Sequence, residues 1–119
     1  MATQKVLTVH NQIPGSNILM IVSSDGFNCC DTPVPQQIYG GVAYNASTPV
    51  NYLRKDGHGC NGRQGQFVFM VYINSILAGE QAFDFDSDGG IELSSNPTSG
   101  FKATLTTNDA GGDYYVMPL

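Results

Sequence analysis

The feature of this sequence that most restricts its fold is a recurring alternation of short apolar runs with clusters of Gly, Pro, Asn and Asp. The runs are rich in β-branched and aromatic residues and recur at roughly 8–12-residue spacing, as strands do in a β-sandwich. No window holds a sustained helical apolar period, and Gly or Pro interrupts almost every candidate helix. The only helix candidate spans residues 75–81, where Gly79 weakens it.

We therefore predict an all-β fold, an antiparallel β-sandwich or small barrel of about eight or nine strands. A chain of 119 residues can build one self-sufficient core but not a second, so residues 1–119 are expected to form a single domain. The predicted strands cover residues 5–10, 18–22, 38–44, 50–54, 66–73, 82–85, 91–94, 101–107 and 114–117.

Two predicted strands, Ile18–Val22 and Phe67–Ile73, are apolar on both faces. A strand of a sandwich needs only one buried face, so the other face of each must be covered as well. A loop or a neighbouring element is one way to cover it. A homo-oligomer that forms through either strand is the alternative.

The charge balance disfavours nucleic acids and anionic lipid surfaces as partners. The net charge is −5, which repels nucleic-acid phosphates and anionic lipid surfaces.

The longest apolar run is too short to cross a membrane as a helix, and the N-terminal segment lacks the pattern of a signal peptide. Only 13% of residues are charged, a composition that favours an extracellular or particle-associated protein, while a cytoplasmic location stays open.

The stretch DFDSDGGIE holds the strongest functional signal. Asp84, Asp86, Asp88 and Gly89 match the start of an EF-hand calcium loop, where alternate carboxylates precede a glycine. The last ligand position is Ser95 instead of Glu, and the flanking residues alternate as strands. The stretch thus resembles a calcium loop on a β scaffold, not an EF-hand.

Strand register makes this prediction more specific. If Phe85 pairs with Ile91 on the core side, Asp84 falls opposite Glu92 on the outer face and residues 86–90 form the loop. Like charges directly opposite repel one another unless a cation or open solvent offsets them. The predicted ligands of a calcium ion are Asp84, Asp86, Asp88 and Glu92.

The Gly-rich stretch 56–65 contains GHGCNG, which matches the letters of the dinucleotide fingerprint. That fingerprint requires a helix after the loop, and a strand follows here, so we reject this function. Positive charge gathers around His58, with Arg54, Lys55 and Arg63 nearby. The loop is either a contact for an anion or carboxylate or a solvated loop on an acidic surface.

The three cysteines leave two readings open. Cys29 and Cys30 are adjacent and would strain to bridge each other, so one of them pairs with Cys60 or all three stay reduced. An adjacent pair chelates zinc poorly together with His58 and Cys60. A nucleophile pair formed by Cys60 and His58 lacks a third residue to orient it. A loop disulfide or buried thiols are therefore expected.

We predict no enzymatic activity, because the chain lacks a nucleophile elbow and an ordered triad, and its paired carboxylates have no apolar cleft. The favoured function is a binding module, lectin-like, whose glycan or other cell-surface ligand meets a loop end with the help of calcium. Tyr and Asn side chains near the loops suit such contacts. The predicted ligand-binding residues are Asp86, Asp88, Glu92, Tyr44, Tyr52, His58 and Arg63.

Two alternatives belong to other functional classes. The opening VLTVHN, followed by a turn and ILMIV, resembles the start of the aegerolysin lipid-binding proteins. This resemblance implies a membrane-active β-sandwich toxin or cytolysin, but the lack of Trp departs from that family. The other alternative is an oligomeric structural or assembly protein that uses its doubly apolar strands as interfaces.

Overall fold

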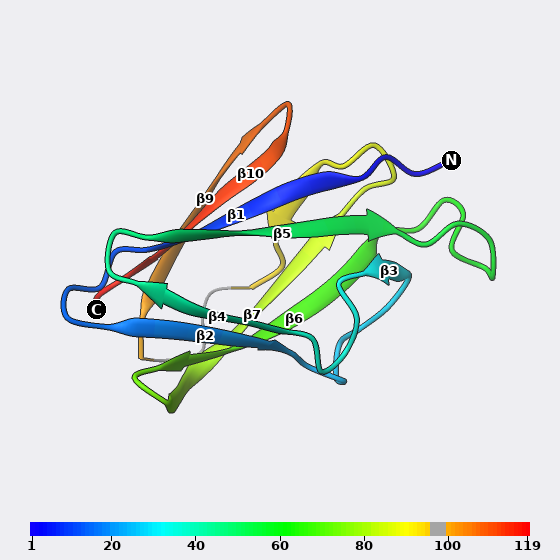
Figure 1. Cartoon of the computed structure of the whole chain (residues 1–119). Coiled ribbons are helices and arrows are strands. Elements are labelled where there is room, and N and C mark those ends of the chain that lie inside the picture. The colour runs from blue at the N-terminus through cyan, green and yellow to red at the C-terminus, as the bar shows by residue number, and fades with distance from the viewer. Residues whose placement is uncertain (96–99) are drawn as a thin grey trace.

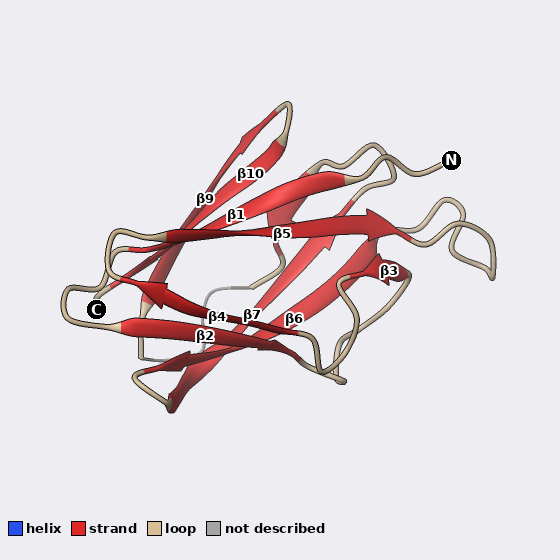
Figure 2. Cartoon of the chain, in the orientation of Figure 1, coloured by secondary structure: helices blue, strands red, loops and turns tan. Residues whose placement is uncertain are grey.

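A computed structural model describes residues 1–95 and 100–119 and shows ten strands in two packed sheets (Figure 1, Figure 2). The described residues contain no helix, and the predicted all-β sandwich is confirmed. The strands are β1 (Lys5–Asn11), β2 (Asn17–Val22), β3 (Cys30–Thr32), β4 (Ile38–Ala43), β5 (Ser47–Arg54), β6 (Gly65–Ile73), β7 (Ile76–Phe85), β8 (Ile91–Leu93), β9 (Lys102–Asn108) and β10 (Gly111–Met117).

One sheet has the strand order β3-β5-β1-β10-β9 and the other has β4-β2-β6-β7-β8. Neighbouring strands run antiparallel except β1 and β10, which are parallel. The first and last strands of the chain thus lie side by side in the middle of one layer (Figure 1).

The core between the layers is built on aromatic rings. Phe67 of β6 stacks on Phe83 of β7, with ring centroids 5.1 Å apart. From the opposite sheet, Tyr114 meets Phe83 edge-on at 4.9 Å and Tyr52 meets Phe85 at 5.1 Å. Such edge-to-face contacts add to the stabilisation that comes from burying the rings.

A buried polar bridge joins the two layers. Gln81 of β7 is fully buried, and its Oε1 accepts a hydrogen bond of 2.9 Å from the hydroxyl of Tyr114. Its Nε2 donates to the carbonyl of Ser95 at 2.6 Å. Because these partners satisfy the amide, burying it does not carry the penalty of an unpaired polar group.

The helix candidate over residues 75–81 does not form a helix, because Ser75 lies in a turn and residues 76–81 belong to β7. Asn74 and Ser75 have φ values of 51° and 68° and form a two-residue turn. Ile76 then pairs with Ile73 of β6. Left-handed residues at both central positions give the turn type that joins two antiparallel strands tightly. Pairing with β6 therefore overrides the weak helical preference of the segment.

The doubly apolar strands β2 and β6 are both interior strands of one sheet. The loop before β3 covers part of the outer face of β6, because Gly26 of this loop lies so close to Val68 that an added Cβ would stand 2.7 Å from Val68 Cγ2. Leu19, Ile21 and Tyr72 instead line an open depression of about 320 Å³. Loop cover is thus present over one part of this face, and an oligomer formed through it stays a prediction.

Candidate functional site

The acidic hairpin, residues 84–92, has the predicted register. Asp84 pairs with Glu92, and the next pair toward the turn closes residues 86–90 into a loop. The Asp86 N–H donates to the Gly90 carbonyl at 2.8 Å, and the Gly89 N–H donates back to the Asp86 carbonyl at 3.0 Å. The carboxylates therefore project from a closed turn with a defined conformation.

Side chains from distant elements hold this turn in place. The buried hydroxyl of Tyr52 on β5 donates to the Gly89 carbonyl at 2.6 Å. Gly89 has a φ of 95°, and a Cβ there would clash with the side chain of Lys5 on β1. Gln64, just before β6, donates from Nε2 to Asp86 Oδ1 at 2.9 Å. The turn is thus fixed to three separate strands or their ends.

The carboxylates of the hairpin repel one another. Partial burial, with a further contribution from the charge of Glu92, raises the pKa of Asp84 above its usual value. No ion pair of the described residues involves Asp86 or Asp88. The hairpin therefore carries negative charge that no lysine or arginine of these residues neutralises at contact distance.

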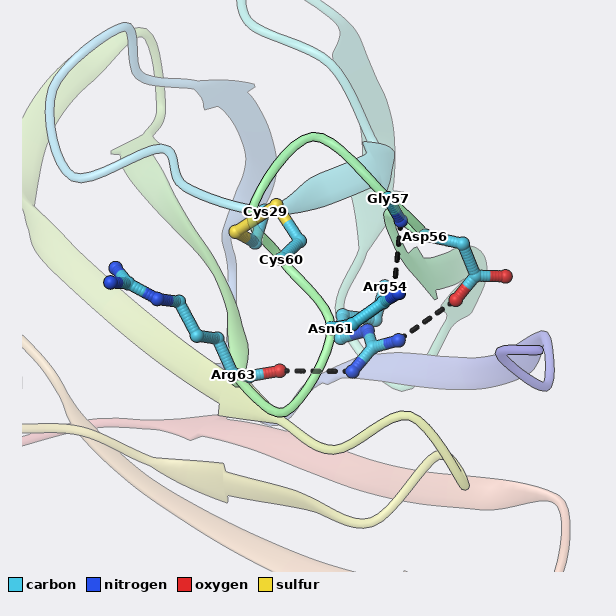
Figure 3. Close-up of a disulfide and its surroundings, with 7 residues drawn as sticks. All are labelled: Cys29, Arg54, Asp56, Gly57, Cys60, Asn61 and Arg63. Carbon is cyan, nitrogen blue, oxygen red and sulfur yellow. Dashed lines mark hydrogen bonds and ion pairs between the residues drawn. A yellow bond between two sulfur atoms is a disulfide. The ribbon is translucent and has the colours of Figure 1, made fainter.

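The Gly-rich loop joins β5 to β6 beside the hairpin. Cys60 of this loop forms a disulfide with Cys29 (Figure 3), and Cys30 is a buried free thiol. The prediction that one of the adjacent cysteines pairs with Cys60 is thus confirmed, and the fully reduced alternative is wrong. With Cys60 in the disulfide, neither the zinc set nor the nucleophile pair with His58 forms.

Arg54 fixes the base of the loop. Its side chain is buried, and it donates to Asp56 Oδ1 at 2.8 Å and to the Arg63 carbonyl at 3.3 Å (Figure 3). The Ala2 backbone N–H, and then the Arg54 side chain, lower the pKa of Asp56 by hydrogen bonding to the carboxylate. The Arg63 side chain points away from Arg54 in the same view, so the two guanidinium groups do not form one cationic site.

Three shallow hollows surround the tip of the acidic hairpin. One of about 290 Å³ separates the tip from the Gly-rich loop, and one of about 300 Å³ separates it from β9. A third of about 260 Å³ lies against the turn between β9 and β10. Five residues each line two of these hollows: Gln64, Asp86, Asp88, Gly90 and Thr107.

Several predicted ligand residues meet at these hollows. Asp86 and Asp88 each border two of them, and Glu92 and Arg63 each border one. His58 is exposed on the same Gly-rich loop, with a left-handed φ of 53°, but it lines none of the three. The structure thus gathers the acids and one arginine, while His58 lies outside the hollows.

The two predicted tyrosines do not join this site. Tyr52 has no exposed surface, because its ring lies in the core and its hydroxyl binds the Gly89 carbonyl of the hairpin from the core side. Tyr44 lies in the turn between β4 and β5. Figure 1 shows this turn at the end of the sandwich opposite the loop that joins β5 to β6. The Tyr44 side chain is 45% exposed, so it is accessible but distant from the acidic hairpin.

Two residues of the site were absent from the sequence-based prediction. Gln64 is a neutral residue of a loop, and Thr107 comes from β9, beyond the hairpin in the chain. The hydrogen bond of Gln64 to Asp86 depends on how two loops face each other. Thr107 reaches the hollow because β9 lies next to β8, the edge strand of the other sheet, without pairing with it in the described residues. Neither relation leaves a local signal in the sequence.

The fit of this site to calcium is partial. The described residues contain no group of three or more His, Cys, Asp or Glu side chains placed to hold a metal ion. Two carboxylate oxygens do lie close to the same point beside Gly90. A Cβ added to this glycine would stand 3.3 Å from Asp86 Oδ2 and 3.5 Å from Asp88 Oδ1. Asp84 and Glu92 face each other on the strands of the hairpin. The tip thus offers two carboxylates to a hard cation that prefers six or more oxygens.

Comparison with known proteins adds no further constraint. The described residues contain no helix that is long and apolar enough to cross a membrane. No protein-family model, no curated protein and no solved structure matches the chain. The function must therefore be argued from the hairpin and its surroundings.

Proposed function

We propose that this protein is a non-enzymatic binding module whose ligand occupies the hollows around the acidic hairpin. The observation that carries the proposal is the convergence of Asp86 and Asp88, which form no ion pair with any described residue, with the neutral polar groups of Gln64 and Thr107. Carboxylates accept strong hydrogen bonds, and amide and hydroxyl groups both donate and accept them. This set of groups is complementary to a ligand with several hydroxyls, such as a carbohydrate.

Calcium is part of the proposal as a co-ligand of the carbohydrate. Asp86 Oδ2 and Asp88 Oδ1 both lie beside Gly90, whose N–H donates to Asp88 Oδ1 at 3.1 Å. The remaining coordination positions of a calcium ion would be filled by water and by ligand hydroxyls. Among the residues that the structure describes, none that lines the three hollows is aromatic and could stack on a sugar ring. Hydrogen bonding and metal coordination therefore account for the proposed affinity.

A glycan array read in calcium and again in chelator tests this function. We expect binding to a subset of glycans that weakens in chelator, and calorimetry on the best glycan measures its Kd. The substitution Asp86→Asn should weaken this Kd by about tenfold or more, because hydrogen bonds to a charged acceptor contribute roughly 1.5–3 kcal/mol. Asp25→Asn, at an exposed carboxylate outside the hollows, is the matched control.

The outcomes separate the parts of the proposal. Silence across the array in both buffers contradicts the carbohydrate ligand. Equal binding in calcium and in chelator removes calcium and leaves the polar site in place. Equal losses in Asp86→Asn and Asp25→Asn would show that the ligand binds elsewhere on the surface.

A further inference from the structure

The open edge of β9 is the part of the fold best suited to pair with another chain. The other three edge strands are interrupted or short: β3 and β8 have three residues each, and β4 has an irregular register against β2. β4 also contains Gly41 at a φ of 73°. Shortness and irregularity are the means by which proteins keep edge strands from pairing with other chains.

β9 has none of these features. Its seven residues pair with β10 in unbroken register from Lys102 to Asn108, and they include no proline. Lys102, at the start of the strand, is its only charged residue. Every second residue of such a strand directs its N–H and C=O away from the paired neighbour. In the described part of the chain, no backbone hydrogen bond satisfies these groups on the open side.

We propose that β9 pairs with β9 of a second copy of this chain, antiparallel about a two-fold axis. The pairing would join two five-stranded sheets into one continuous sheet. Residues directly opposite must point to the same face, so the symmetric register with greatest overlap is centred on Leu105. In this register, Thr104 faces Thr106 of the second copy and Lys102 faces Asn108 of the second copy.

The chemistry of β9 complements itself in this register. Leu105 and Ala103 are half-buried on the core side, and pairing covers Leu105 with its own counterpart. Lys102 comes beside Asn108 of the second copy, whose amide donates to Asp113 at 3.1 Å. A cation therefore approaches an acidic neighbourhood twice in each dimer. This attraction opposes the repulsion between two chains that each carry a net charge of −5.

This interface differs from the one predicted through β2 or β6. Both of those strands already pair on their two edges, so their backbone groups are not available to a second chain. Their outer faces would have to associate through side chains alone. β9 offers both unpaired backbone groups and matched side chains, and the proposal therefore places the second copy there.

Sedimentation equilibrium of the full chain tests the proposal between micromolar and millimolar concentrations. The wild type should reach about twice the monomer mass of 12.7 kDa. T104K/T106K places ammonium groups opposite each other at two symmetric positions and should raise the dimer Kd by about tenfold. T104E/T106K places opposite charges there and should restore the dimer. Both residues are exposed, and circular dichroism checks that each variant folds.

Backbone amide exchange of the wild type provides a readout that needs no substitution. Exchange along β9 should slow as the protein concentration rises, while exchange along β4 stays constant. A wild type that remains monomeric at millimolar concentration overturns the proposal. So does a dimer that T104K/T106K leaves intact, or one that both double variants disrupt equally, because the register would then not decide the pairing.

Discussion

Removal of the Cys29–Cys60 disulfide should reveal how much the anchoring of the Gly-rich loop stabilises the fold. The bond joins the start of β3 to the Gly-rich loop, with Cys29 and Cys60 separated by 31 residues. The substitution C29A/C60A removes it without placing a hydroxyl in the nearly buried position of Cys60. Reduction of the wild type by a thiol reagent provides the same perturbation without any substitution.

The magnitude follows from the length of the closed loop. Closing a loop of 31 residues lowers the entropy of the unfolded chain, which stabilises the folded protein by about 3.7 kcal/mol at 25 °C. Both perturbations should lower the free energy of unfolding by this amount. A chain of 119 residues unfolds with an entropy near 0.25 kcal/mol/K, so this loss lowers the Tm by about 15 °C. Both perturbations should also increase the urea m-value, because an uncrosslinked unfolded chain exposes more surface.

Urea and thermal unfolding, followed by circular dichroism, measure these changes. The reduced wild type and the oxidised C29A/C60A variant should agree to within about 1 kcal/mol, and reductant should not affect the variant further. The Cys60 N–H donates to the Gly57 carbonyl at 2.8 Å, and the Arg63 N–H donates to the Cys60 carbonyl at 2.9 Å, so both bonds lie within the loop. Amide exchange should therefore quicken at Cys60 in the reduced wild type, and at Arg63 in both the reduced wild type and the variant. A loss below about 1 kcal/mol in both arms would refute the reasoning that the crosslink acts through loop entropy.

Three further predictions concern single side chains. Asp84→Asn removes the repulsion with Glu92 and should stabilise the protein by about 0.5 kcal/mol in urea titrations at neutral pH. The gain should vanish in acid, because the wild-type carboxyl of Asp84 becomes neutral once the pH falls through its raised pKa. Tyr52→Phe should destabilise by about 1–3 kcal/mol in the same assay, because the buried Gly89 carbonyl loses its 2.6 Å donor. Burial raises the pKa of Cys30 to about 12, so Ellman's reagent at pH 8 should detect no thiol in the native protein and one after denaturation.

Much of the fold follows from local patterns. The strand alternation predicted the sandwich, and the apolar residues flanking the hairpin predicted that Asp84 faces Glu92. Register could be read here because the paired ends of both strands and their turn lie within eleven consecutive residues, 83–93. The parallel pairing of β1 with β10 had no such signal, since it joins the two ends of the chain. β3 was missed because three residues directly before a proline-containing loop are too few to show alternation.

The candidate site was predicted less completely, for a different physical reason. The position of Tyr52 was in fact readable: Val50 and Tyr52 are two residues apart on one strand and share its buried face. The aromatic residue was assigned to a ligand by its chemistry, although the period of the strand places it in the core. Gln64 and Thr107 required the packing of two sheets, which no single strand encodes.

The acidic hairpin combines firm anchoring with unresolved repulsion, and this combination is the strongest argument for a function there. A hairpin selected for stability alone would not keep Asp84 opposite Glu92 with two further carboxylates at its tip. Its turn is nevertheless fixed by the buried hydroxyl of Tyr52 and by Gln64, so the acids cannot move apart by rearranging the loop. Such a structure fits a role in which a cation or hydroxyl groups bind between the carboxylates. If so, Asp84→Asn should stabilise the free protein more than the protein saturated with calcium and glycan.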